Sequence, residues 1–229
     1  MKVLKTLLSI VLLACIAGLA YLIVDSVQQP VRFNHEKEKR EAVAVQNLKD
    51  IRTLQVAFKG ETNRYCSTLD SLKDFYENGE MSVIMKIGSM DDSLAAQHTA
   101  EVKKAKKGIT DAQLYELYKA GDKNLVFSIT EKIKVKESLF TDRDDFNVNN
   151  LKYIPYSDGA LVEMTAITKT VSGVQVPLFE AKMPYKLLLK GLDNQLRINL
   201  DDQRKQQNKY VGLQVGSIEA PNNNAGNWE

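Results

Sequence analysis

The segment of the sequence best suited to metal chemistry is Asp142-Arg-Asp-Asp-Phe-Asn147. Carboxylate and amide oxygens at such spacing are ligands that Ca²⁺ accepts in protein loops. The loop glycine and the terminal bidentate glutamate of an EF-hand are missing, however. The pattern therefore favours a solvated turn before a strand, and a calcium-binding loop over residues 142–147 is the alternative.

Other residue types that support catalysis are scarce. The 2 histidines, His35 and His98, lie in neither an HExxH motif nor a His/Cys ligand spacing. P-loop, GxSxG and GxGxxG motifs are absent from the sequence. Cys66 is expected to be a small buried residue rather than a nucleophile. We therefore expect no catalytic, cofactor-binding or metal-binding residues and no enzymatic activity; the alternative is a tethered enzymatic or ligand-binding domain built from scattered residues.

Composition narrows the class of protein further. The chain has 229 residues, of which 31 are basic and 29 acidic, and its net charge is +2. This balance gives no electrostatic footprint for nucleic acid, so no nucleic-acid partner is expected. Apolar residues make up 44% of the chain, which is enough for a soluble domain to bury a core. Cys15 and Cys66 are the 2 cysteines, too few for a disulfide framework.

An apolar segment near the N-terminus predicts that the chain is anchored in a membrane. No charged residue interrupts the sequence from Thr6 to Val24, and a helix needs roughly 20 residues to cross the hydrocarbon core of a bilayer. Lys2 and Lys5 precede the segment, and the next basic residue after it is Arg32. Because positive charge favours the cytoplasmic side, we expect a cytoplasmic N-terminus. The lipid bilayer is then the first expected partner.

Two processing alternatives remain open beside this uncleaved anchor. A signal peptidase could cut at Ala17-Gly-Leu-Ala20, although the apolar stretch is longer than that of a usual signal peptide. Leu12-Leu-Ala-Cys15 resembles a lipobox, but the chain stays apolar after the cysteine instead of continuing into a polar tether. We therefore expect residues 1–29 to be retained as a transmembrane anchor, with residues 30–229 outside the cytoplasm.

Small residues within the anchor could contact a second helix. Ala14 and Gly18 form a small-xxx-small pair, and Ala17 lies beside them. The alternative is that these small residues reflect only the ordinary composition of a membrane helix. If they do form a packing face, its partner is another membrane protein or a second copy of this chain.

In the soluble part, apolar residues recur at helical spacing up to about residue 120 and alternate as in β-strands after residue 124. Residues 33–120 are expected to be mainly helical, with a helix over 34–61 whose apolar stripe lies on one face. That stripe contains Ala44, Leu48, Ile51, Gln55 and Phe58, flanked by Val45 and Leu54. Pro30 predicts a break or kink before this helix. Further helices are expected from a capping box at Ser67-x-x-Asp70 to Gly79, and over 111–120.

Residues 124–218 are expected to be rich in strands. Alternation predicts strands over 125–130, 132–136 and 196–200. A hairpin is expected to join 151–154 to 160–168 through the turn at 157–159, and the Ser172-Gly173 turn to lead into 174–180. Pro184 can open a short helix that ends at Gly191. The polar tail 219–229 is expected to be loosely held. Helices followed by mostly antiparallel strands predict an α+β fold.

The N-terminal third carries a resemblance to a known family. Leu48-Lys-Asp-Ile-Arg-Thr-Leu-Gln-Val-Ala-Phe-Lys59, then Asn63-Arg-Tyr65 and Leu69-Asp-Ser-Leu72, resemble type IV pilins and the major pseudopilins of type II secretion. The resemblance implies an apolar helix that runs into an amphipathic one before a C-terminal antiparallel sheet. Gly18 is followed by Leu19, and the apolar segment has no glutamate, so the prepilin-peptidase site of that family is not present.

The whole chain also resembles a family of uncharacterised single-pass envelope proteins of Bacteroidota. The resemblance runs from PVRFNHEKEKREA at 30–42 through KGLDNQLRINLDDQRK at 190–205 to NNNAGNWE at 222–229. It implies a bacterial inner-membrane protein whose soluble domain is periplasmic. This second resemblance implies no known activity. The anchor followed by an amphipathic helix and the lack of active-site motifs favour a non-enzymatic, pilin-like subunit or accessory protein of a secretion, adhesion or surface-assembly complex.

Overall fold

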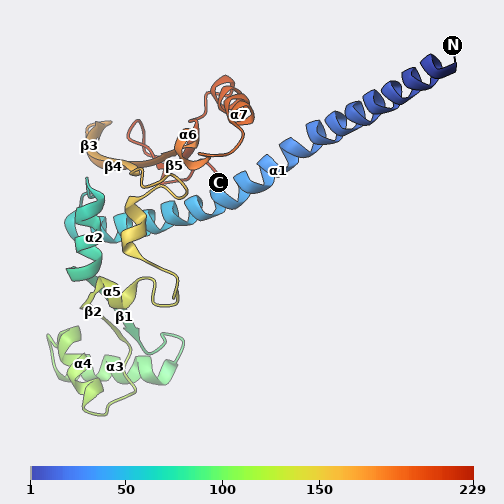
Figure 1. Cartoon of the computed structure of the whole chain (residues 1–229). Coiled ribbons are helices and arrows are strands. Elements are labelled where there is room, and N and C mark those ends of the chain that lie inside the picture. The colour runs from blue at the N-terminus through green and yellow to red at the C-terminus, as the bar shows by residue number, and fades with distance from the viewer. Residues whose placement is uncertain (1) are drawn as a thin grey trace. The chain divides into compact units, whose positions relative to one another are not determined.

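A computed structural model describes residues 2–229, with side chains described for residue 7 and for residues 10–229. It combines helices with antiparallel sheets, so the predicted α+β class is confirmed (Figure 1). The chain forms two compact units. The first contains the described part of Met1–Thr53 with Ser67–Leu69 and Asn147–Glu229, and the second contains Leu54–Cys66 and Asp70–Phe146.

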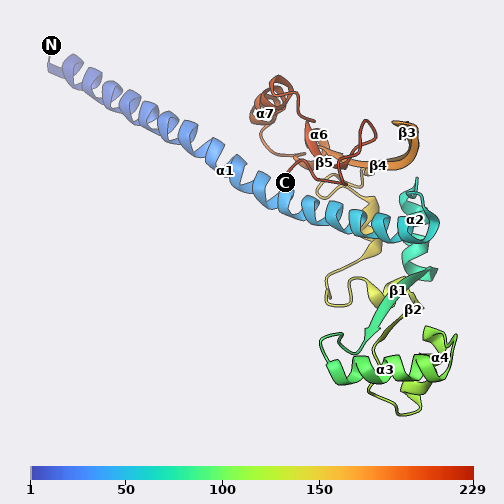
Figure 2. The ribbon, with the colours of Figure 1, turned by 180° about the vertical axis from the view of Figure 1, so that it is seen from behind.

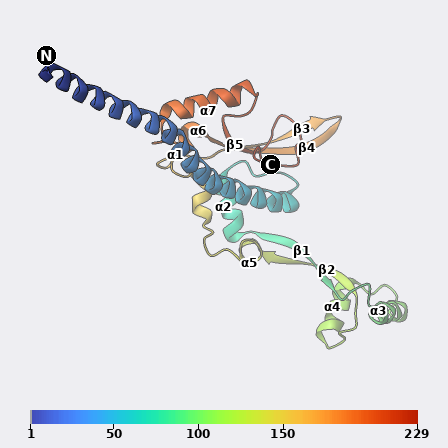
Figure 3. The ribbon, with the colours of Figure 1, turned by 90° about the vertical axis from the view of Figure 1, so that its right-hand side faces the viewer.

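The longest element is the helix α1, Lys2–Thr62. Its 61 residues extend over about 90 Å at the rise of an α-helix. Of the break or kink predicted at Pro30, the break does not occur, because the helix continues through that residue. Proline removes one backbone hydrogen bond here, while the turns beside it are held by a Gln29–Asp193 hydrogen bond of 2.6 Å and by the burial of Phe33. Figure 3 shows that the helix axis bends along its length.

The predicted apolar stripe on α1 is confirmed. Ala44, Leu48, Ile51 and Gln55 of the stripe have no exposed surface, and neither has Leu54 beside them, whereas Phe58 and Val45 are half-buried. Spacings of three and four residues place these side chains on one helix face. Burial of that face, rather than helix propensity alone, is what fixes this part of α1.

The first unit contains a three-stranded antiparallel sheet. Its strands are β3, Glu163–Val171, β4, Val174–Pro184, and β5, Gly212–Gly216, in the order β3-β4-β5. The predicted turn is confirmed: Ser172 and Gly173 have φ of 51° and 82°, which suits the tight hairpin that pairs Val171 with Val174. Phe179, Ala181, Met183, Leu213 and Val215 are the buried apolar residues of one sheet face.

Two helices follow β4 in the first unit. The short helix predicted after Pro184 is confirmed as α6, Tyr185–Leu188. The strand predicted over 196–200 is wrong, because these residues lie in α7, Asn194–Gln206. Asp193 begins this helix by accepting a hydrogen bond from the Leu196 N–H at 2.9 Å, and an Arg197–Asp201 ion pair joins successive turns. These polar contacts select the helix over the alternation of Leu196, Ile198 and Leu200.

The hairpin predicted to begin at residue 151 is largely replaced by other structure. Val148–Lys152 forms a 3₁₀ turn, η1, and only Tyr153 and Leu161 form a bridge around the predicted turn. Ser157 explains this, because its hydroxyl donates to the Ile154 carbonyl at 2.6 Å and accepts from the Ala160 N–H at 3.0 Å. The side chain closes a compact loop before a longer ladder can form.

The C-terminal tail is attached to the first unit, so the expectation of a loosely held tail is wrong. Gly226 bridges Val215 of β5, and the Asn227 side chain bonds the backbone of Gly212 and Gln214. Arg52 of α1 binds the Glu229 carboxylate at 2.7 Å. The tail therefore covers the outer edge of β5 and joins it to α1.

The second unit is built around a two-stranded antiparallel ribbon. Its elements are α2, Leu69–Asn78; β1, Glu80–Ile87; α3, Ser93–Ala105; α4, Asp111–Lys119; β2, Phe127–Lys134; and α5, Val135–Ser138. In this unit α2 lies at one end of the ribbon and α3 and α4 at the other (Figure 2). Helices α2 and α4 were predicted, although Thr68 rather than Ser67 precedes α2. The two strands predicted over 125–130 and 132–136 form the single strand β2, and β1 was not predicted.

Gln55 is a polar member of the buried stripe, and its contacts explain why. Its side-chain amide donates to the Cys66 carbonyl and accepts from the Cys66 N–H, both at 2.8 Å. The amide group thus pairs with the backbone where the chain turns back after α1. Cys66 is itself buried, as predicted.

Replacing Gln55 by leucine should lower the free energy of unfolding by roughly 2–3 kcal/mol, because two buried backbone groups lose the partners that the amide supplied. Denaturant unfolding of the purified protein measures this change. Thr53→Leu, at an exposed position two residues earlier, is the control. Equal stability of the two variants would show that the Gln55 contacts contribute nothing.

Candidate functional site

The most unusual surface of the protein is the N-terminal part of α1. Large apolar side chains project from all sides of this helix, and Ile10–Thr62 contains a stretch long and apolar enough to cross a membrane, in which no residue is buried. Side chains more than half exposed are Leu7, Ile10, Val11, Leu12, Leu13, Ile16, Leu19, Tyr21, Leu22, Ile23, Val24, Val27 and Val31. An all-round apolar helix is stable in lipid and not in water. The structure thus contains one candidate transmembrane helix.

The three small residues predicted as a packing face are exposed on this helix. Ala14, Ala17 and Gly18 lie three and four residues apart and share one side of it. Apart from the neighbouring residues and backbone of the helix itself, no described atom lies within 4 Å of where a Gly18 Cβ would be. A second helix could therefore approach the backbone closely here, which is what small residues permit in membranes.

The exposed part of α1 is continuous with the part that enters the first unit. Among the described side chains of the helix, Phe33 is the first that is buried, and it follows Val31, which is 64% exposed. Arg40 donates to the carbonyls of Leu188 and Lys190 at 3.2 and 2.8 Å. The exposed part of α1 thus passes into the packed part within one continuous helix, in which Phe33 and then Ala44 are buried.

A buried polar network fixes α1 against α6 and α7. The Tyr185 hydroxyl donates to Glu41 and accepts from Arg204 at 2.6 Å, and Lys37 forms an ion pair with Glu41 at 3.3 Å. Burial, followed by the bond to Glu41, raises the pKa of Tyr185 well above its usual value. The hydroxyl therefore stays neutral, and its role is structural.

A second polar cluster lies on the sheet face opposite the buried apolar residues. Glu180 is buried, forms an ion pair with Lys182 and accepts from the Gln214 amide at 2.8 Å. The Tyr210 ring lies 5.3 Å from the Lys182 ammonium group. Burial, and then the negative charges of Glu163 and Glu180, raise the pKa of Tyr210 to about 12. This face thus holds a tyrosine that resists ionisation.

Alkaline pH should test that cluster. Tyr210 keeps its proton more tightly in the folded chain than in the unfolded chain, where its pKa is about 10. Its contribution to stability is therefore complete below about pH 10 and is lost as the pH rises towards 12. We expect Tyr210→Phe to flatten the fall in unfolding free energy between about pH 10 and about pH 12, and the exposed Tyr153→Phe to leave it unchanged. A Tyr210→Phe slope equal to that of the wild type would contradict this.

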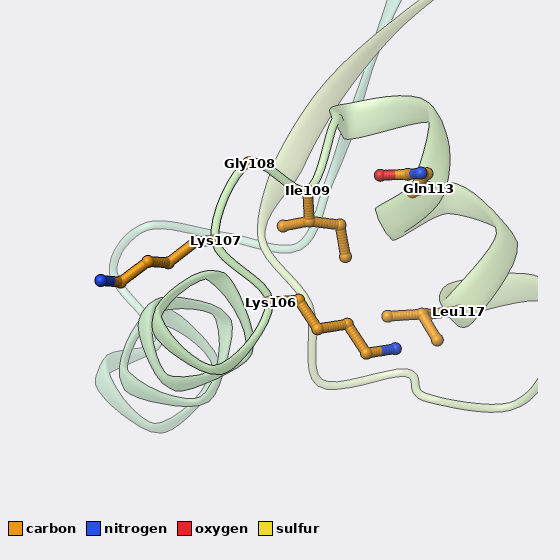
Figure 4. A pocket seen from close by; sticks show the side chains of 6 residues that line it. All are labelled: Lys106, Lys107, Gly108, Ile109, Gln113 and Leu117. Atoms are coloured by element: carbon orange, nitrogen blue, oxygen red, sulfur yellow. The ribbon is translucent and has the colours of Figure 1, made fainter.

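One surface pocket of the second unit lies where the segment that follows α3 meets α4. It has a volume of about 420 Å³ and is lined by Lys106, Lys107, Gly108, Ile109, Gln113 and Leu117. The Lys106 side chain extends across it towards Leu117, whereas Lys107 points away (Figure 4). Its lining residues supply one ammonium group and one amide, and no nucleophile or carboxylate, so these residues do not form a catalytic arrangement.

In the loop at 142–147, the carboxylates do not converge on a common metal site. Asp145 is 79% exposed and forms an ion pair with Arg143 at 3.3 Å, and that arginine lowers the pKa of Asp145. Within residues 2–229 as described, no three His, Cys, Asp or Glu side chains lie close enough to hold a metal ion. The structure thus brings no support to the calcium alternative.

One pair of chemically capable residues was not predicted. The His98 Nε2 atom on α3 lies 2.8 Å from an Asp122 carboxylate oxygen just after α4. These residues are 24 positions apart, and no sequence motif joins them. Both side chains are partly exposed, so the pair connects the middle of α3 to the turn after α4 at the surface.

Comparison of the sequence with protein-family models, with curated proteins and with solved structures finds no match.

Proposed function

We propose that this protein is a single-pass membrane protein whose uncleaved N-terminal helix holds a periplasmic α+β domain at the bacterial inner membrane. The observation that carries the proposal is the continuity of α1. One helix exposes apolar side chains up to Val31, buries Phe33, and then buries an apolar stripe from Ala44 onward. Cleavage after Ala20, or lipidation at Cys15, would cut this helix within its apolar part.

The proposed orientation places the N-terminus in the cytoplasm. Lys2 and Lys5 resist translocation, and Asp25 is the first charged residue after the span. The direct passage from span to domain would keep the first unit close to the membrane surface. A domain held in this way suits a component of an assembled complex better than a freely diffusing protein.

The proposed role is that of a non-enzymatic, pilin-like subunit or accessory protein of a secretion, adhesion or surface-assembly complex. Two things support it: the resemblance of residues 48–72 to pilins and pseudopilins, and a long helix that is apolar in its first half and packs in its second half. The absence of catalytic motifs from the sequence is the basis for the non-enzymatic part. Other membrane proteins or further copies of this chain are the proposed partners.

The location is tested by combining mass spectrometry of the mature N-terminus with protease treatment of spheroplasts. We expect the apolar segment to be retained and the domain to be digested from outside. A chain that starts at an acylated Cys15 would establish a lipoprotein instead. A domain that is cut only after lysis would reverse the orientation and refute the periplasmic role.

The partner-facing side of the anchor is tested by photocrosslinking in the native membrane. A photoreactive residue at Gly18 should give discrete crosslinked products, because the small-residue side would contact a neighbouring helix. The same residue at Ile16, on the opposite side of the helix, is the matched control. Equal crosslinking at both positions, or none at Gly18, would contradict a partner at this face.

A further inference from the structure

The strand β1 has one unpaired edge. It pairs only with β2, in a sheet of two strands. The Ser82 N–H donates to a Glu61 carboxylate oxygen at 2.7 Å, so the Ser82 backbone faces away from β2. By the alternation of a β-strand, the backbone groups of Glu80, Ile84 and Lys86 face the same way. Isolated two-stranded ribbons are marginal in water, and an open edge of this length is a template for another strand.

The alternation restricts how a second copy of β1 could pair with this edge. In an antiparallel pair, outward-facing residues must lie opposite outward-facing residues. A two-fold pairing can therefore be centred on Ser82, Val83 or Ile84, and not between two residues. These registers differ in the side chains that they bring together.

Only the register centred on Val83 matches charge with opposite charge. It places Glu80 opposite Lys86 of the second copy, and Lys86 opposite Glu80 in return. Both side chains are exposed, and no ion pair involving either appears among the described residues. Glu80 already lies across from Lys134 of β2, so the second copy would place this carboxylate between two lysines.

The same register also joins the apolar residues of β1. Met81 would lie opposite Met85, and Val83 opposite Val83, on the half-buried face of the ribbon. On the other face Ile84 is 65% exposed, and the two Ile84 side chains would become diagonal neighbours. Pairing would therefore extend the ribbon into four strands and cover its most exposed apolar side chain.

We propose that two copies of this protein associate through antiparallel pairing of their β1 edges, centred on Val83. Glu61 competes for one of the groups involved, since it occupies the Ser82 N–H and lies 3.3 Å from the Ser82 hydroxyl. Its carboxylate protects the edge of the single copy and must leave on pairing. The association is independent of the proposed membrane function, because it uses only the second unit.

Disulfide trapping of the full-length protein in detergent tests the register. In a Cys15→Ser background, Val83→Cys should form a disulfide-linked dimer, because residues opposite each other at a position without backbone hydrogen bonds lie at a suitable separation. Met85→Cys is the control, since the two copies of this residue would be about 13 Å apart along the strands. Equal yields from both variants, or no dimer from Val83→Cys, would overturn the proposal.

A charge swap separates the proposed pairing from chance collision. In the Val83→Cys protein, Glu80→Lys or Lys86→Glu alone should reduce the dimer yield about tenfold, since each dimer would then contain two like-charged pairs. The double variant with both changes should restore the yield, and this rescue also excludes misfolding as the cause. Loss without rescue, or no effect of the single changes, would overturn the register.

Discussion

Deleting residues 2–24 is expected to transfer the protein from the membrane fraction to the soluble fraction while both units stay folded. The described side chains in this segment are exposed, and the first buried residue of α1 is Phe33. The deletion therefore removes exposed apolar surface and, among the described side chains, none that is buried. Ultracentrifugation of cell lysates measures the transfer, and circular dichroism measures the folding.

A pair of substitutions provides the matched test in the full chain. Leu13→Lys with Ile16→Lys places two charges in the centre of the apolar segment, each costing about 3 kcal/mol on insertion scales. Leu13→Ala with Ile16→Ala shortens the same side chains without charge and should leave the protein in the membrane. A lysine variant that still sediments with membranes, in an otherwise folded state, would show that another surface holds the protein there.

Truncating Leu48 to alanine is expected to lower the free energy of unfolding by roughly 2–5 kcal/mol, the largest effect that we predict for a single substitution. Leu48 has no exposed surface and lies at the centre of the stripe on α1. Removing its side chain leaves a cavity that the surrounding residues cannot fully close. Denaturant unfolding of the protein without residues 2–24 is the suitable measurement.

Val43→Ala is the control for Leu48→Ala. Val43 lies on the same helix and in the same unit, but its side chain is 42% exposed. Its truncation should change the unfolding free energy by less than about 0.5 kcal/mol. Similar losses from both variants would mean that the stripe on α1 is not the face that packs in the first unit.

The sequence alone determined the features that depend on local periodicity. The apolar stretch from Thr6 to Val24, the stripe from Ala44 to Phe58 and the Ser172-Gly173 turn were all readable, because each is encoded by residues close together in the chain. Helix α4 was predicted for the same reason, and its capping box at Thr110 is present. A local pattern of apolar residues shows which face of a helix or strand will be buried, even when the segment that packs against that face is unknown.

Only the tertiary structure decided the features that depend on distant partners. The alternation of residues 196–200 fits a strand as well as a helix face, and the Asp193 cap selected the helix. The tail is polar in sequence, yet Arg52, 177 residues before Glu229, holds its end. Likewise Gln55 could be placed in the stripe from its position, but the Cys66 backbone that it binds became visible only when the chain had turned back on α1. Hydrogen bonds between residues far apart in the chain follow no periodic pattern in the sequence, and only the three-dimensional structure shows them.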